Sequence, residues 1–300
     1  MKQVFLVIFL LFGFVAGAQN VTVRKPKKQK PATTHVAPKK ERASKQRKVQ
    51  SKKAKVDISP TIGKANYTPN VKTFYANGVS FEMVEVRGGT FRMGATSEQG
   101  SDAWDDEKPV HSVTLSEYYI GKTEVTQALW KAVMGSNPSS FKGDNLPVEC
   151  VSWNDCQEFI RKLNSLTGQK FRLPTEAEWE FACRGGNNSR GYKYSGSNYI
   201  DNVAWYDGNS GKKTHPVGTK LPNELGIYDM TGNVWEWCSD WYGRKYSSGA
   251  QTNPKGPYDG SYRVDRGSSW DGNARCYRSS GRFCNSPGHY RYCHGFRLSL

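Results

Sequence analysis

The segment YRVDRGSSWDGNARCYRSSGRFCNSPGHYRYCHGFRLSL (residues 262–300) decides the fold, because it interleaves two sets of residues. The first set is a frame of fixed character: Arg266, Gly267, Ser269, Trp270, Arg278, Arg282, Pro287 and residues 295–298. The second set fills the gaps with Asp, Gly, Asn, Cys, Tyr, Ser, His and Phe, and it has no apolar period. The segment is therefore predicted to lack helices and ladder strands and to form a contact surface.

The first 18 residues are typical of a secretory signal. Lys2 supplies the charged start, residues 4–15 form an apolar run, and residues 16–18 (AGA) are a small-residue cleavage site. The run is too short for an ordinary membrane span, and no Cys follows it to carry a lipid anchor. We therefore expect an exported chain that begins at Gln19 and has no transmembrane span. Its expected location is the periplasm, the cell surface or the medium.

The net charge of +16 belongs to a linker and not to the domain that follows it. Residues 19–65 hold 15 Lys and Arg against two acidic residues, whereas residues 66–300 hold 27 against 25. Because residues 19–66 have no Phe, Trp or Tyr and few large apolar side chains, they are predicted to be a disordered basic linker. A solvated spacer is the favoured interpretation, and adhesion of residues 19–65 to an anionic envelope polymer is the alternative. Specific nucleic-acid binding is not expected without aromatic stacking platforms.

Residues 67–300 are predicted to form one domain. All nine Trp lie after residue 100, and all seven Cys lie after residue 149. An odd number of Cys in an exported chain leaves at least one thiol free or paired between chains. Alternating residues predict strands at 79–86, 90–94 and 110–115. The acidic loop 97–108 is interpreted as solvated, with metal binding as the alternative.

Three helices are predicted from apolar spacing and capping residues. One covers residues 123–134, with apolar residues every four positions. The second follows the capping box of Ser152 and Asp155, and the third follows the capping box of Thr175 and Glu178. Their apolar stripes are interpreted as core rather than as a cofactor site. Downstream of the third helix turn dipeptides dominate, and buried aromatic side chains are expected to hold the chain.

Several long motifs occur in one order along the chain. They are residues 172–186 (RLPTEAEWEFACRGG), 226–237 (GIYDMTGNVWEW), 266–270 (RGSSW) and 295–297 (GFR). Together they resemble the formylglycine-generating enzyme (sulfatase-modifying factor) family over about residues 79–300. The resemblance implies a compact α+β fold, related to the C-type lectin domain, with little regular secondary structure. It also implies a binding surface built by the C-terminal loops.

The resemblance further implies a calcium site. Family members bind Ca²⁺ through a side chain, two backbone carbonyls and a Glu, which correspond here to Asp229, Gly232, Val234 and Glu236. Carboxylate and carbonyl oxygens are the hard donors that Ca²⁺ prefers. The alternative is that the two carboxylates cap a turn and pair with arginines.

Active family members oxidise a substrate Cys to formylglycine with a pair of Cys, four residues between them, that hold copper(I). Soft thiolates suit copper(I), and its linear coordination requires two of them. Cys276 resembles the second Cys, but Asp271 or Gly272 stands at the position of the first. Cys276 and Ser269 are therefore the only catalytic candidates. Copper is not expected, and Cys276 is interpreted as a structural or free thiol.

The residues between the frame positions predict a recognition surface. Tyr supplies rigid amphipathic contact area, while Ser, Gly and Asn supply adaptable hydrogen bonds. The residues expected to contact a ligand are Asp271, Asn273, Tyr277, Phe283, Asn285, His289, Tyr290, Tyr292 and His294. Every residue type in this set can be encoded by a codon ending in C. The tail therefore also resembles the variable region of diversity-generating retroelement proteins, some of which use this fold.

These patterns lead to one hypothesis and two alternatives. The hypothesis is an exported domain of the formylglycine-generating enzyme family that lacks the copper pair and binds a protein or glycan ligand through residues 268–294. The first alternative is a formylglycine-generating oxidase that acts on sulfatase cysteines. The second is a structural component of an envelope assembly.

Overall fold

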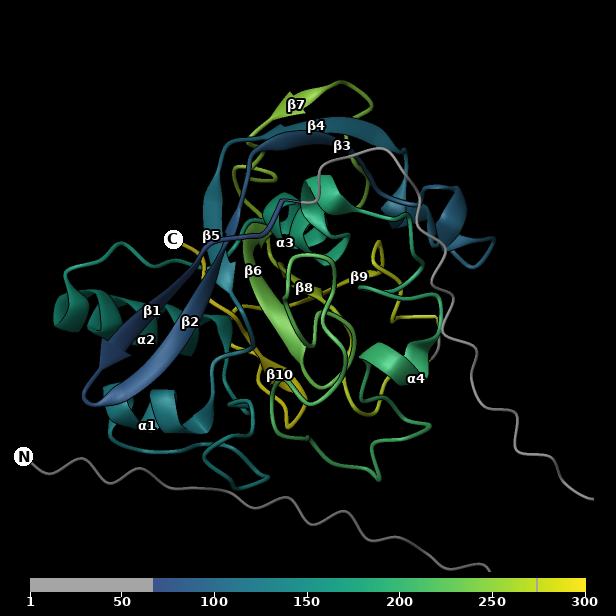
Figure 1. The fold of residues 1–300 in the computed structure, drawn as a ribbon. Coiled ribbons are helices and arrows are strands. Elements are labelled where there is room, and N and C mark those ends of the chain that lie inside the picture. The colour runs from purple at the N-terminus through teal and green to yellow at the C-terminus, as the bar shows by residue number, and fades with distance from the viewer. Residues whose placement is uncertain (1–66, 274) are drawn as a thin grey trace, which may run out of the picture. The chain divides into compact units, whose positions relative to one another are not determined.

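In the computed structural model, three small β-sheets and four α-helices make up the part of the chain that the structure describes, residues 67–273 and 275–300 (Figure 1). The predicted signal (1–18) and linker (19–66) lie outside these described residues. The strands are β1 Val71–Ala76, β2 Val79–Val86, β3 Gly89–Met93, β4 His111–Leu115, β5 Tyr118–Gly121, β6 Trp235–Trp241, β7 Gln251–Thr252, β8 Arg263–Arg266, β9 Arg282–Asn285 and β10 His294–Gly295. The helices are α1 Gln127–Met134, α2 Trp153–Thr167, α3 Glu176–Cys183 and α4 Ile200–Val203. None of these helices is long and apolar enough to cross a membrane.

The sheets have the strand orders β1-β2-β5, β3-β4-β7 and β10-β6-β8-β9. The hairpin of β1 and β2 turns at Asn77 and Gly78, whose φ angles of 45° and 83° suit these two residue types. The predicted strand 79–86 is confirmed as β2. The predictions 90–94 and 110–115 correspond to β3 and β4, with boundaries that differ by one residue.

The third sheet corrects the prediction that residues 262–300 lack ladder strands. Arg263 pairs with Asn285 and Arg266 with Arg282 along the antiparallel pair β8 and β9, and β10 joins the other edge of β6. The apolar strand period is hidden because arginines occupy buried positions. Arg266 is 0% exposed and Arg282 is 2% exposed. The tail therefore supplies three of the four strands of this sheet.

Helices α2 and α3 begin where their capping boxes predict. The Ser152 hydroxyl accepts a hydrogen bond from the backbone N–H of Asp155 at 3.1 Å. The Thr175 hydroxyl accepts one from the N–H of Glu178 at 3.2 Å. In each case the acidic side chain bonds back to the N–H of the cap residue, so both local predictions are confirmed.

Helix α1 is shorter than the predicted helix 123–134, because it starts only after its cap, Thr126. The residues before it pair instead with distant backbone. The N–H of Val125 donates to the carbonyl of Phe296 at 2.9 Å, and the N–H of Val148 donates to the carbonyl of Val125 at 2.8 Å. Apolar spacing alone could not separate the helix from this buried extended stretch.

Two apolar clusters lie against the third sheet and fix the tail between them. Trp237 of β6 belongs to the cluster that contains Phe159 of α2. The next residue, Cys238, belongs to the cluster that contains Trp179 of α3. Because successive side chains of β6 point to opposite faces, the sheet packs against α2 on one side and α3 on the other. The loops of the tail connect the strands of this sheet.

Candidate functional site

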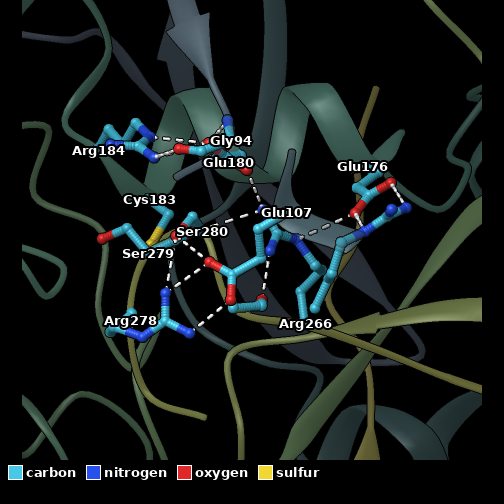
Figure 2. Close-up of polar contacts among 12 residues, drawn as sticks. Gly94, Glu107, Glu176, Glu180, Cys183, Arg184, Arg266, Arg278, Ser279 and Ser280 are labelled. Carbon is cyan, nitrogen blue, oxygen red and sulfur yellow. Dashed lines mark hydrogen bonds and ion pairs between the residues drawn. The ribbon is translucent and has the colours of Figure 1, made fainter. Parts of the chain in front are cut away.

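Buried arginines anchor the tail to the rest of the domain. Arg266 forms an ion pair with Glu180 of α3, and Arg282 binds Glu176 of the same helix at 2.7 Å. Figure 2 shows Arg266 beside the carboxylates of α3 and Arg278 beside Glu107. Removing one partner of a buried ion pair typically costs about 3–5 kcal/mol, because the other charge is left unpaired. The arginines of the frame are therefore structural.

The acidic loop 97–108 is not wholly solvated, contrary to its interpretation from sequence. Glu107 is 0% exposed and accepts hydrogen bonds from both terminal nitrogens of Arg278 and from the hydroxyl of Ser280 (Figure 2). Burial opposes ionisation, but these donors hold the pKa of Glu107 below its ordinary value. The charge pattern of the loop could not reveal this role, because Arg278 lies 171 residues further along the chain.

Five of the residues predicted to contact a ligand are exposed. Asp271 and Asn273 lie in the loop after β8, and Phe283 on β9 is 49% exposed. Tyr290 and Tyr292, between β9 and β10, are 65% and 39% exposed. The structure therefore brings aromatic and polar side chains from two loops and one strand to the surface of the tail. Asn285 and His289 are half-buried beside them.

Tyr277 and His294 are buried and do not belong to this exposed set. Tyr277 is 1% exposed, and its hydroxyl lies 2.8 Å from the carbonyl oxygen of Ser269. The same hydroxyl accepts a hydrogen bond from the N–H of Asp207. His294 is 3% exposed, with Nε2 3.4 Å from Asp265. Both side chains pack inside the tail. Residue type alone therefore assigned them to the contact surface, although they are buried.

A layer of tryptophan supports the exposed aromatic side chains. The Phe283 ring lies 5.6 Å from that of Trp235, and the Tyr292 ring lies 5.5 Å from that of Trp270. Phe141 meets Trp270 edge-on at 5.6 Å. Phe141 comes from the loop after α1, and no local pattern in the sequence marks it as part of the site. We call Phe283 on Trp235 and Tyr292 on Trp270, together with the exposed Tyr290, the aromatic surface.

The two catalytic candidates are enclosed by their own loop. Ser269 is 0% exposed, and its hydroxyl donates to the carboxylate of Asp271 at 2.7 Å. Cys276 is 9% exposed. At Gly272, a Cβ atom would lie 2.2 Å from the Ser268 hydroxyl, so a cysteine at that position would require the Ser268 side chain to move. Asp271, at the other position equivalent to the first Cys, is exposed.

The thiols near this loop favour their protonated form. Burial raises the pKa of Cys276. Burial raises the pKa of Cys293, which lies in the same apolar cluster, to about 12. Thiolates are the form that attacks a substrate or binds copper(I). The environment of these two cysteines therefore opposes the state that such chemistry requires.

The four predicted calcium ligands lie on one segment, but the carboxylate of Glu236 is already paired with other side chains. Its carboxylate binds Arg297 through two nitrogens at 2.6 Å each and accepts a hydrogen bond from the Trp179 indole. This is the alternative role predicted for it. Between the two acids, a Cβ atom at Gly232 would lie 2.2 Å from the Trp205 carbonyl oxygen, so the turn requires glycine. Val234 is fully buried.

Asp229 and Glu124 form a buried acidic pair that the sequence analysis did not identify. Asp229 is 3% exposed and Glu124 is 2% exposed, and each has one oxygen without a hydrogen-bond partner in the described part of the chain. Burial raises the pKa of Asp229 to about 6 and that of Glu124 well above its ordinary value. Two buried carboxyl groups that each have an oxygen without a partner could supply hard donors to Ca²⁺, which binds them in the deprotonated form. No three His, Cys, Asp or Glu side chains within residues 67–273 and 275–300 are grouped to hold a metal.

Comparison with known proteins places the chain in a family. The family described as "Sulfatase-modifying factor enzyme 1-like domain" matches residues 70–300. The chain is similar to the chaperone protein LppX of Paenibacillus barcinonensis, at 36% identity over 64% of this chain and 79% of the relative. It is also similar to the formylglycine-generating enzyme of Streptomyces coelicolor, at 32% identity over 72% of this chain and 88% of the relative.

A solved structure supports both the fold and the family. Treponema denticola variable protein 1 is 36% identical, with a TM-score of 0.70 over 78% of this chain and 99% of that protein. The α+β fold predicted from the motifs is thereby confirmed. Because the family match covers residues 70–300, the chain belongs to the sulfatase-modifying factor enzyme 1-like family, as its motifs predicted.

Proposed function

We propose that this protein is a ligand-binding member of its family, which contacts a protein or a glycan through residues 268–294. The observation that carries the proposal is the aromatic surface, where Phe283 and Tyr292 are exposed while packing on Trp235 and Trp270. Rigidly supported aromatic side chains bind partners at a low cost in conformational entropy.

The frame supports the same proposal. Arg266, Arg278 and Arg282 are each held by a buried carboxylate, so the loops between them have fixed ends. Asp271 and Asn273 lie in the first of these loops and are exposed, and Tyr290 is exposed in the loop between β9 and β10. A fixed frame with exposed adaptable residues suits recognition of a partner.

A formylglycine-generating oxidase is the less supported alternative. It would require a thiolate pair at the tail, whereas burial raises the pKa of both Cys276 and Cys293. Asp271 or Gly272 stands where the family's first copper-binding Cys is expected. The proposal is therefore binding without copper-dependent oxidation.

The binding experiment uses the mature chain as a probe on glycan arrays and surface-protein libraries. A ligand found with the wild type should bind at least about tenfold more weakly to the triple variant Phe283→Ser, Tyr290→Ser and Tyr292→Ser. The control variant carries Tyr75→Ser and Tyr258→Ser, two exposed tyrosines outside the tail, and should bind normally. Equal binding by the triple variant would contradict the proposed surface. If the protein is instead a structural part of an envelope assembly, the triple substitution changes assembly alone.

The oxidase alternative has its own assay. The protein is incubated with copper and a peptide of the form Cys-x-Pro-x-Arg, and formylglycine is sought by mass spectrometry. We expect the cysteine to remain unmodified. Copper-dependent oxidation that disappears in Cys276→Ser would establish the oxidase and contradict the proposal.

Variation of the tail is a second part of the proposed function. The similarity to a protein named variable protein 1 supports the suggestion that the exposed residues are diversified by a retroelement. The gene's flanks provide the test. A reverse transcriptase gene with a near-copy of the tail that differs at adenines is expected, and its absence from the locus would argue against diversification.

We further propose that Ca²⁺ binds at Asp229 and Glu124, with the carbonyls of Gly232 and Val234 as further donors. The unpaired oxygens of Asp229 and Glu124 support this assignment. When bound, Ca²⁺ would neutralise the two carboxylates and stabilise the turn 229–234. Calcium should raise the melting temperature of the wild type at constant ionic strength, and Asp229→Asn should remove the effect. A melting temperature that chelator leaves unchanged would rule out a stabilising site.

Export by the signal at residues 1–18 completes the proposal. The charged start, apolar run and small-residue cleavage site support it. The basic residues 19–65 would then tether the domain, with an anionic envelope polymer as a candidate partner. Mass spectrometry of the purified native protein should find Gln19 at the N-terminus. Recovery of the chain with Met1 intact would contradict export by cleavage.

A further inference from the structure

Arg263, at the start of β8, lies between two indole rings. The central carbon of its guanidinium is 3.4 Å from the ring centroid of Trp241 and 3.9 Å from that of Trp153. Trp153 is itself fixed, because its indole N–H donates to the carbonyl of Cys238 at 2.9 Å. The guanidinium is therefore held in one orientation before any partner arrives.

Arg263 differs from the buried arginines of the tail in having no carboxylate partner. Arg266, Arg278 and Arg282 all form ion pairs, whereas no carboxylate among the described residues lies within ion-pair distance of Arg263. The one hydrogen bond of its guanidinium in that part of the chain runs from Nη1 to the Ser239 carbonyl at 2.6 Å. Nε is buried there without a partner. The guanidinium thus keeps donor capacity that the fold does not use.

The electrostatic state of Arg263 favours an incoming anion. Burial lowers the pKa of Arg263, and Asp240 opposes this only from beyond ion-pair distance. Burial also raises the pKa of Asp240 to about 7, so this carboxyl is a weak counter-charge near neutral pH. The Arg263 side chain remains partly exposed, so a ligand can reach it. A partly desolvated cation without a counter-ion gains more from a new anion than a fully hydrated one does.

We propose that Arg263, between Trp153 and Trp241, is a binding site for an oxyanion group: a carboxylate, sulfate or phosphate. At the end of the planar guanidinium, Nη2 has no hydrogen-bond partner among the described residues and can donate to an oxygen of such a group, while the indoles set the plane. The site is separate from the aromatic surface, since neither indole nor Arg263 belongs to it. It would add recognition of an acidic group to whatever the aromatic surface binds, and it stands without that function.

The test uses the isotope-labelled mature chain, titrated with sodium phosphate, sodium sulfate and sodium acetate at constant ionic strength, with chloride as the reference anion. Nuclear magnetic resonance follows the indole N–H of Trp153 and the Nε–H of Arg263. At least one anion should produce saturable shifts in the millimolar range. Arg263→Lys should weaken that binding about tenfold, because it keeps the charge but loses the planar donor pair.

The control is Arg92→Lys, on β3, where an exposed arginine also has no carboxylate partner among the described residues but no indole on either side. It should leave the anion shifts unchanged. A preference for phosphate would indicate a phosphorylated group, a preference for sulfate a sulfated glycan, and a preference for acetate a carboxylate ligand. Shifts that rise linearly for all three anions, or that saturate equally in Arg263→Lys, would overturn the site.

A second variant keeps the test decisive. Arg263→Gln removes the charge, and its melting temperature establishes whether the chain is folded before titration. If it is folded, it should show no saturable shift. If it does not fold, the comparison of wild type with Arg263→Lys decides. The triple variant of the aromatic surface should still bind the anion, which separates failure of this site from failure of the proposed function.

Discussion

The tail contains two regions that differ in what holds them. Arg266, Arg278 and Arg282 are at most 2% exposed and are paired with buried carboxylates, whereas Phe283 and Tyr290 are 49% and 65% exposed. The buried arginines fix the backbone, and the exposed side chains have few partners to lose. The difference teaches that one segment can carry both buried, paired residues and exposed residues with few contacts.

The same contrast holds between ion pairs of different burial. The side chains of Arg278 and Glu107 are both 0% exposed, whereas those of Arg161 and Glu158 on α2 are 67% and 42% exposed. An exposed pair contributes about 0–1 kcal/mol, because water screens both charges. A buried pair leaves an uncompensated charge when it is broken. Substitutions in the two regions should therefore differ by several kcal/mol.

The largest effect is expected from Arg278→Met. It leaves Glu107 buried without its charged partner, so the free energy of unfolding should fall by about 3–5 kcal/mol. Urea unfolding measures the loss. The matched control is Arg161→Met, which should leave the urea midpoint nearly unchanged, because water screens the exposed pair. Equal losses of stability for the two substitutions would contradict the conclusion that buried arginine pairs hold the frame while exposed pairs do not.

A pH-dependent effect of similar size is expected at Asp240. Burial raises its pKa in the folded chain to about 7, above the ordinary value of 3.8. The folded chain therefore holds the proton more tightly, and the resulting stability is full below about pH 4 and is lost as the pH rises through 7. Relative to wild type, Asp240→Asn should gain up to about 4 kcal/mol between pH 4 and pH 8. Parallel stability curves for the two proteins, measured by urea unfolding at each pH, would contradict this.

An intermediate effect is expected from Tyr277→Phe. The substitution removes the hydroxyl that bonds to the Ser269 carbonyl and to the Asp207 N–H, so it should cost about 1–3 kcal/mol. Tyr206→Phe is the control, because that hydroxyl bonds to Asp201 in an exposed setting. Its cost should stay within about 0.5 kcal/mol. If thermal unfolding gave the same loss of stability for both variants, the buried structural role of the Tyr277 hydroxyl would be contradicted.

The smallest effect on stability is expected from Tyr290→Ser. The side chain is 65% exposed, so unfolding should change by less than about 0.5 kcal/mol. Binding of the ligand found on the arrays should fall in the same variant. Urea unfolding measures the change in stability. A large loss would show that Tyr290 is a structural residue like the buried arginines.

Local signals predicted the parts of the fold that depend on neighbouring residues. The capping boxes at Ser152 and Thr175 located α2 and α3, because a cap acts within a single turn. The ordered motifs predicted the family and the α+β fold. The strands β8 and β9 were not predicted, because Arg266 and Arg282 occupy buried positions that normally carry apolar residues.

The candidate site was predicted in part, for the same physical reason. The exposure of Phe283 and Tyr290 was anticipated from residue type, and their contact with a ligand stays a prediction. The burial of Tyr277 and of Glu124 beside Asp229 was not predicted, because both depend on contacts between distant segments. Residue chemistry can indicate a surface, but packing decides which members of the set reach it.

The separation of a rigid frame from a replaceable surface is tested most directly by a single fivefold variant. It combines Asp271→Asn, Asn273→Ser, Phe283→Tyr, Tyr290→Ser and Tyr292→His, all drawn from the residue types already found in the tail. Urea unfolding should give a free energy within about 1 kcal/mol of wild type, while ligand binding is lost. A loss of stability as large as that of Arg278→Met, or unchanged ligand binding, would contradict the separation.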